Sequence, residues 1–240
     1  MAYDYKKSRQ NVIAELTQKT KIANARSPKV QDLTFENGKK ACISACFVDI
    51  RSSSKLFKNN SEKADEKIAR LMRAFSGEII KIMRDKNYIH IGLQGDCVYG
   101  VFSTPKQEHI NKIFSMSAQI NSFIIMLNKT LSQNKFEEIK VGIGLSTGND
   151  LIIKAGADDT GINDILFIGN AVAEARHNSS EANKSINYAI VASSIFRQNL
   201  NNHNKNLLRH EYNFHAGKVY AGNIINCDMD NWTNNNFRDN

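Results

Sequence analysis

The sequence predicts an α+β protein whose core is a ferredoxin-like split βαββαβ sheet with an added hairpin and added helices. Residues 41–50 (ACISACFVDI) form a nearly continuous apolar run, which is typical of a buried central strand. Apolar residues recur at three- and four-residue steps over 61–84 and over 107–131, which indicates two amphipathic helices. The dipeptides Gly95-Asp96 and Gly148-Asn149 separate short apolar stretches and indicate two hairpin turns.

The same patterns divide the chain into three parts. We expect an N-terminal helical arm over residues 1–39, with an amphipathic helix at 8–22, then one domain over 40–222 and a loosely ordered Asn-rich tail over 223–240. The expected elements of the domain are a strand at 41–50, a helix at 61–84, strands at 88–93 and 97–102, a helix at 107–131, a hairpin of 139–147 and 151–155, a strand at 164–168, a helix at 171–183, a strand at 188–191 and a helix at 193–200.

Composition narrows the class of protein. The chain has 240 residues, 41% of them hydrophobic, and a net charge of +8. Its best apolar run, 123–127, is far shorter than the roughly 18–20 residues of a membrane span. The first residues lack the apolar core of a signal peptide, so we expect a cytoplasmic protein without a membrane span.

The four cysteines include no CxxC pair, and we expect Cys42 and Cys46 to be reduced core thiols. The positive charge permits an anionic partner, but scattered lysines are equally typical of a solvated surface.

Two aspartates are predicted to meet at one edge of the sheet. Asp49 ends the first core strand and Asp96 begins the third, and these strands are antiparallel neighbours in a split βαβ sheet. Unpaired carboxylates there would repel one another, and a hard divalent cation such as Mg²⁺ or Mn²⁺ resolves that conflict. A pair of such ions could hold a nucleoside triphosphate and activate its 3′-hydroxyl. The alternative is that Asp49 caps a helix over 52–58 and Asp96 is a turn residue.

Several segments, in order, resemble the signatures of class III nucleotidyl cyclases: FVDI followed by SSSKLF, then QGDCVYGVF, VGIGLSTG, FIGNAVAEARHNSSEA and IVASSIF. The resemblance covers residues 40–200 and implies that the domain at 40–222 is a cyclase catalytic domain. It implies that Asp49 and Asp96 bind two Mn²⁺ or Mg²⁺ ions per site, together with the carbonyl group of Ile50. It assigns triphosphate binding to Lys218 and to the backbone N–H groups at a helix start, in the segment Arg51, Ser52, Ser53 and Ser54.

The chain departs from that family at positions that contact the base and the ribose. The two base-reading positions hold Gly92 and Leu166, so a purine edge in this pocket would find no charged partner. The positions of the family's ribose-orienting Asn and transition-state Arg hold Ala173 and His177. Arg176 lies one residue before His177 and is our candidate for the catalytic arginine.

With these departures the chain resembles the pyrimidine nucleotide cyclases of bacterial antiphage (Pycsar-type) systems. The resemblance implies a cyclic CMP or cyclic UMP messenger that acts on a separate effector, and the small polar Ser53 favours CTP over UTP. A single copy of each motif implies a homodimer in which both subunits complete each site. Two alternatives stay open: an adenylyl or guanylyl cyclase with an atypical base pocket, and a non-catalytic basic ferredoxin-like RNA-binding domain. The sequence lacks the K/R-G-F-x-F pattern of RNA-recognition motifs, so we expect no nucleic-acid partner.

Overall fold

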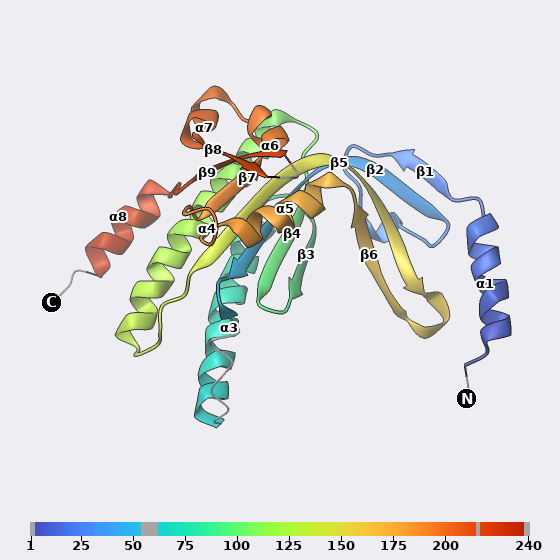
Figure 1. Ribbon diagram of the computed structural model, residues 1–240, viewed down its shortest axis with the longest axis horizontal. Coiled ribbons are helices and arrows are strands. Elements are labelled where there is room, and N and C mark those ends of the chain that lie inside the picture. Colours follow the sequence, from blue (N-terminus) through green and yellow to red (C-terminus); the bar gives the residue numbers. More distant parts are fainter. Residues whose placement is uncertain (1–2, 54–61, 215–216, 238–240) are drawn as a thin grey trace.

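A mixed sheet forms the centre of the molecule (Figure 1). The computed structural model describes residues 3–53, 62–214 and 217–237, and within these ranges the sheet has nine strands. Their order is β3-β4-β2-β5-β7-β9-β8, with β1 beside β2 and β6 beside β5. The strands are β1 (Lys21–Asn24), β2 (Asn37–Ile50), β3 (Tyr88–Gln94), β4 (Cys97–Ser103), β5 (Val141–Ala157), β6 (Ile162–Ile168), β7 (Ile190–Ser193), β8 (His210–Phe214) and β9 (Gly217–Gly222). The β3-β4-β2-β5 order is that of a split βαβ core, so the predicted fold class is confirmed.

Helices cover both faces of this sheet (Figure 1). The long helices α3 (Glu62–Arg84) and α4 (Gln107–Gln133) pack on one face and bury the main apolar core. On the opposite face, α5 (Asn170–Glu181) packs against β2 and β5. The shorter helices are α1 (Tyr5–Thr17), α6 (Ser194–Gln198), α7 (Asn202–Leu207) and α8 (Cys227–Asn236). None of the helices in the described ranges combines the length and the apolar character that a bilayer-spanning helix requires.

The predicted hairpin at Gly148-Asn149 is wrong. Residues 141–157 form the single strand β5, which pairs with β2 from Ile50↔Val141 to Gly38↔Ile153. The long partner strand overrides the local turn signal, since each residue of β5 gains a neighbour by remaining extended. The hairpin instead joins β5 to β6 through a short 3-10 turn, Asp158–Thr160.

The described residues near both ends of the chain form more regular structure than predicted. The first helix ends at Thr17 rather than at residue 22, and β1 then adds a parallel strand beside the start of β2. The predicted loose tail contains α8, which Asn226 caps by accepting a hydrogen bond from the N–H of Met229. The Asn226 N–H donates to Ser122 Oγ of α4 over 2.8 Å, so the tail is fastened to the core.

Glycines on β5 allow α5 to approach the sheet closely. A Cβ atom on Gly144 would lie 2.0 Å from the carbonyl oxygen of Ala175 and 2.2 Å from the nitrogen of Ser179. Because both obstacles are helix backbone, a side chain at Gly144 would push α5 away from β2 and β5. The position of α5 over the strands therefore depends on this glycine.

We expect Gly144→Ala to lower the free energy of unfolding by about 2–3 kcal/mol, because the helix must move to relieve the overlap. Chemical denaturation of the purified variant measures this difference. Gly77→Ala is the matched control: Gly77 lies in α3, and among the described residues nothing beyond its own helical turn lies within 4 Å of an added Cβ. That control should gain up to about 1 kcal/mol from helix propensity. Equal effects of the two substitutions would contradict the close packing of α5.

Candidate active site

Asp49 and Asp96 lie together at one edge of the sheet. Asp49 pairs in register with Cys97, and Asp96 occupies the tight turn that joins β3 to β4. Both carboxylates line one cavity of about 350 Å³, together with Gln94, Gly95, Cys97, Arg176, Ser179 and Ser180. The register of the split sheet thus brings together two residues that are 47 positions apart in the sequence, as the predicted topology requires.

The environment of Asp49 is unfavourable for an isolated negative charge. Desolvation raises the pKa of Asp49, and the nearby Asp96 raises it further, while the positive charges of Arg51 and Arg176 act in the opposite direction. Arg51 donates a hydrogen bond to Asp49 Oδ2 over 2.5 Å and another to the carbonyl oxygen of Ser180 over 2.8 Å. Arg51 therefore ties the end of β2 to α5 while it partly neutralises Asp49.

The donors present at this edge fit a hard divalent cation. Asp49 and Asp96 supply carboxylate oxygens, the ligands that Mg²⁺ and Mn²⁺ prefer. No cluster of three or more His, Cys, Asp and Glu side chains that could hold a metal occurs among the residues described. Further ligands would therefore have to come from backbone oxygens, such as that of Ile50 at the end of β2, or from a phosphate group.

The segment after β2 turns sharply beside the carboxylates. Ser52 has a φ of 57°, in the left-handed region, and Ser53 follows it as a half-buried residue. Ser54, the last residue of the predicted triphosphate-binding segment, lies outside the described residues, as does most of the helix that was predicted over 52–58.

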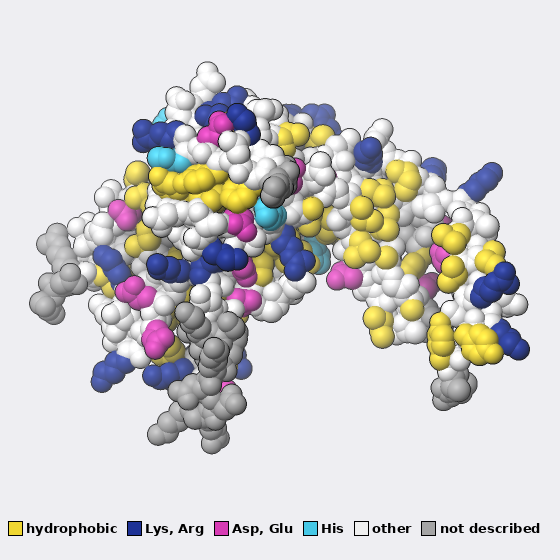
Figure 2. All heavy atoms as spheres, in the orientation of Figure 1, with side chains coloured by type: hydrophobic (Ala, Val, Ile, Leu, Met, Phe, Trp, Pro, Cys, Tyr) yellow, Lys and Arg dark blue, Asp and Glu magenta, His cyan; other side chains and the backbone are white. Residues whose placement is uncertain are grey.

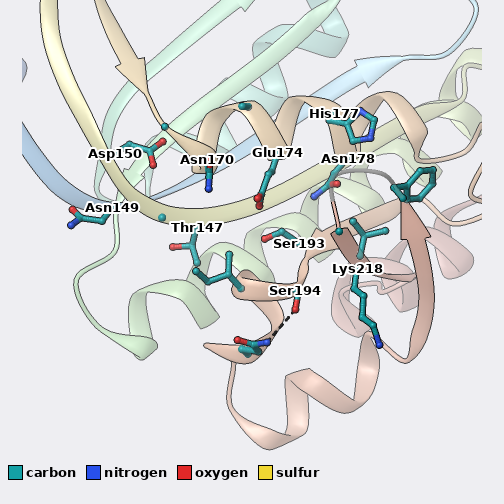
Figure 3. A pocket seen from close by; sticks show the side chains of 18 residues that line it. Thr147, Asn149, Asp150, Asn170, Glu174, His177, Asn178, Ser193, Ser194 and Lys218 are labelled. Carbon is teal, nitrogen blue, oxygen red and sulfur yellow. Dashed lines mark hydrogen bonds between the residues drawn. The ribbon is translucent and has the colours of Figure 1, made fainter.

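Arg176 and His177 lie on opposite sides of α5. Arg176 faces the carboxylates and lines their cavity. His177 lines a larger cavity of about 700 Å³ on another side of the helix (Figure 3). The rings of His177 and Phe214 are nearly perpendicular, with their centroids 5.9 Å apart. Successive helical residues point about 100° apart, so Arg176 and His177 of one chain face different cavities, and the catalytic role expected of Arg176 stays a prediction.

Lys218 also lines the larger cavity. Figure 3 shows it on β9, across the cavity from Glu174 and His177 of α5. Its ammonium group forms an ion pair of 2.7 Å with Glu211, and this contact raises the pKa of Lys218. The structure thus places Lys218 with His177 and away from the cavity of Asp49 and Asp96.

A third cavity, of about 290 Å³, adjoins the carboxylates and shares Gln94 and Arg176 with their cavity. Leu166 of β6, one of the two residues predicted to contact the base, lines this cavity. Gly92 is not among its lining residues in the described chain, because the side chain of Tyr99 lies over this glycine. Sequence reasoning missed Tyr99, although a hairpin centred on Gly95-Asp96 pairs it with Gly92.

The start of α5 is held by a buried carboxylate that sequence reasoning also missed. Asp150 of β5 accepts hydrogen bonds from the backbone N–H groups of Ala171 and Val172. Burial raises the pKa of Asp150, and these two hydrogen bonds oppose that shift. Gly169 leaves room for the contact, since a Cβ there would lie 2.3 Å from the Asp150 carboxylate. Asp150 therefore positions α5 and, through it, both Arg176 and His177.

Comparison with known proteins agrees with this geometry. Residues 35–182 match the family described as the adenylate and guanylate cyclase catalytic domain. The chain belongs to the class III nucleotide cyclases. Its sequence is 38% identical to that of uridylate cyclase from Treponema porcinum over 243 residues, which cover 100% of this chain and 84% of that protein. It is 29% identical to uridylate cyclase from Gulbenkiania mobilis over 252 residues, which cover 98% and 97% of the two chains.

A solved structure shares the cyclase fold. The class III adenylyl cyclase-like ATP-binding protein from Pseudomonas aeruginosa superposes with a TM-score of 0.72 at 14% identity. The match covers 95% of this chain and 48% of that one, so the cyclase chain spans about half the length of the Pseudomonas protein. At this identity the likeness shows the fold alone.

Proposed function

We propose that this class III cyclase converts a pyrimidine ribonucleoside triphosphate to its 3′,5′-cyclic monophosphate and diphosphate, and that UTP is the preferred substrate. The observation that carries the proposal is the cavity beside the carboxylates, where an uncharged Leu166 holds one base-reading position and Tyr99 covers the other, Gly92. The name uridylate cyclase for both relatives supports UTP. The small Ser53 favours CTP, so CTP is the competing substrate to be tested.

Cyclisation consists of three changes at the substrate. The 3′-hydroxyl oxygen forms a bond to the α-phosphorus, the bond from that phosphorus to the α–β bridging oxygen breaks so that diphosphate leaves, and the hydroxyl proton passes to solvent. Asp49 and Asp96 are placed to hold two divalent cations, Mn²⁺ or Mg²⁺, against the phosphates. Such ions, when bound, lower the pKa of the attacking hydroxyl and offset the charge of the leaving diphosphate. Arg176, in the same cavity, offers a guanidinium group to the phosphate oxygens.

We further propose that the working enzyme is a homodimer. Within one chain, α5 separates Asp49 and Asp96 from His177 and Lys218. A second copy could bring its own His177 and Lys218 to the open side of the carboxylate cavity. Figure 2 shows apolar side chains gathered at the end of the molecule formed by α1, β1, β5 and β6. Leu16 and Ile162 there are 81% and 77% exposed, which is typical of a surface that a second subunit covers.

The resemblance to cyclases of antiphage systems extends the proposal to biology. The cyclic product would act as a messenger that activates a separate effector protein during phage infection. This step depends on the resemblance and on the proposed activity.

Incubation of the purified chain with each of the four ribonucleoside triphosphates and Mn²⁺ tests the proposed activity. Chromatography should show cyclic UMP as the main product and cyclic CMP as a lesser one. Cyclic AMP or cyclic GMP as the main product would establish a purine cyclase with an atypical pocket instead. The Asp85→Asn variant should behave like the wild type, since Asp85 is an exposed carboxylate that lines a different cavity.

A further inference from the structure

Three residues form a row across neighbouring strands beside the catalytic carboxylates. Gly92 of β3 pairs with Tyr99 of β4, and Tyr99 pairs with Phe47 of β2, so all three lie on the face of the sheet that carries Asp49. Asp49 follows Phe47 by two residues along β2. The row therefore lies two residues along the strands from Asp49 and the proposed phosphate site, within reach of the base of a bound nucleotide.

Tyr99 is held in one position from two sides. Its ring stacks on Phe47 with centroids 5.1 Å apart and planes only 12° apart. Its hydroxyl lies 3.2 Å from His90 Nε2, and the His90 ring in turn lies 5.9 Å from Phe167 of β6. Tyr99 is thus connected through His90 to the far wall of the cavity that Leu166 also lines.

The end of the Tyr99 ring occupies the space above Gly92. A Cβ on Gly92 would lie 2.5 Å from Cζ and 2.5 Å from the hydroxyl oxygen of Tyr99. Any side chain at position 92 must therefore displace Tyr99. The ring of Tyr99 can lie where it does because position 92 is a glycine. The ring takes up the room in which a residue at position 92 would otherwise reach the base.

We propose that Tyr99, held by Phe47 and His90, determines the base specificity of this cyclase by closing the cavity behind a single-ring base. The inference rests on the proposed function. A purine presents a second fused ring, and this ring would need the space that Tyr99 fills. A pyrimidine ends before it and packs against the apolar wall formed by Leu166 and Phe167. Selection here is by size: Arg176 also lines the carboxylate cavity, where its guanidinium group is proposed to bind the phosphate oxygens, and Leu166 and Phe167 offer the base an apolar wall.

The test compares Tyr99→Ala with Tyr99→Phe. Titration calorimetry with Mn²⁺ and the α,β-methylene analogues of UTP and ATP measures base preference without turnover. We expect Tyr99→Ala to shift the ratio of ATP-analogue to UTP-analogue affinity by about tenfold or more toward ATP, since the ring no longer blocks the space. Tyr99→Phe keeps the ring and should keep the preference for UTP. Tyr88→Ala, an exposed tyrosine on the same hairpin outside the cavity, should leave the ratio unchanged.

Tyr99→Leu is measured in parallel, so that unfolding of the Ala variant does not end the test. A wild-type chain that prefers the UTP analogue, with Tyr99→Ala and Tyr99→Leu keeping that preference unchanged, overturns the inference and leaves the proposed function intact. A wild-type chain that binds neither analogue, or that prefers the ATP analogue, overturns both.

Discussion

Asp49→Asn should abolish nucleotide cyclisation while the chain remains folded. The amide has nearly the volume of the carboxylate but cannot neutralise a divalent cation, so the proposed metal site loses half of its carboxylate charge. We expect turnover to fall by at least about a thousandfold, which corresponds to about 4 kcal/mol of activation free energy. Steady-state kinetics with UTP and Mn²⁺ measure the loss. Asp96→Asn should give a loss of similar size, because Asp96 lines the same cavity.

Stability distinguishes this loss from misfolding. The pKa of Asp49 is raised, chiefly by desolvation. At neutral pH its ionised form is therefore less favourable in the folded chain than in the unfolded chain. A neutral Asn should leave the free energy of unfolding unchanged or higher, with Arg51 still bonded to Ser180. Near-normal turnover in a folded Asp49→Asn variant would contradict the assignment of a metal site to this edge.

Mixing inactive chains should restore activity only for particular pairs. An Asp49→Ala chain mixed with a His177→Ala chain should recover about a quarter of wild-type activity, since half of randomly formed dimers are mixed and each mixed dimer keeps one of its two sites. Recovery is expected because Asp49 and His177 lie on opposite sides of α5 and would serve different composite sites. Turnover of UTP after exchange of subunits measures the recovery.

The control pair is Asp49→Ala with Arg176→Ala. Arg176 lines the cavity of Asp49 in the same chain, so both substitutions damage the same half of the site and every dimer carries two defective sites. We expect no recovery from this pair. Equal recovery from both pairs would show that Arg176 acts on the carboxylates of the other subunit. Failure of the Asp49 and His177 pair, in proven mixed dimers, would argue against a composite site.

The juxtaposition of Asp49 and Asp96 was predictable because it depends on topology alone. A split βαβ order makes the first and third core strands antiparallel neighbours, and the residues at their adjoining ends must meet. The long helices α3 and α4 were predictable for a similar reason, since their apolar periods extend over many turns. The strand order and the helical periodicity each extend over many residues, and no single side-chain contact decides them.

Features that depend on one contact could not be predicted in the same way. Gly148-Asn149 is a good local turn signal, and only the pairing of the long strand β2 shows that the chain passes straight through it. The sides on which Arg176 and His177 lie depend on which face of α5 is buried. That face is set by Ala171, Ala175, Asn178 and Ser179, and a count of motif spacing does not reveal it.

A crystal structure of the chain with Mn²⁺ and α,β-methylene-UTP tests the central claim most directly. The analogue keeps the triphosphate but cannot release diphosphate. We predict anomalous manganese density between the carboxylates of Asp49 and Asp96, with the uracil ring in the cavity lined by Tyr99 and Leu166. A nucleotide bound elsewhere, with no manganese at Asp49 and Asp96, would contradict the account.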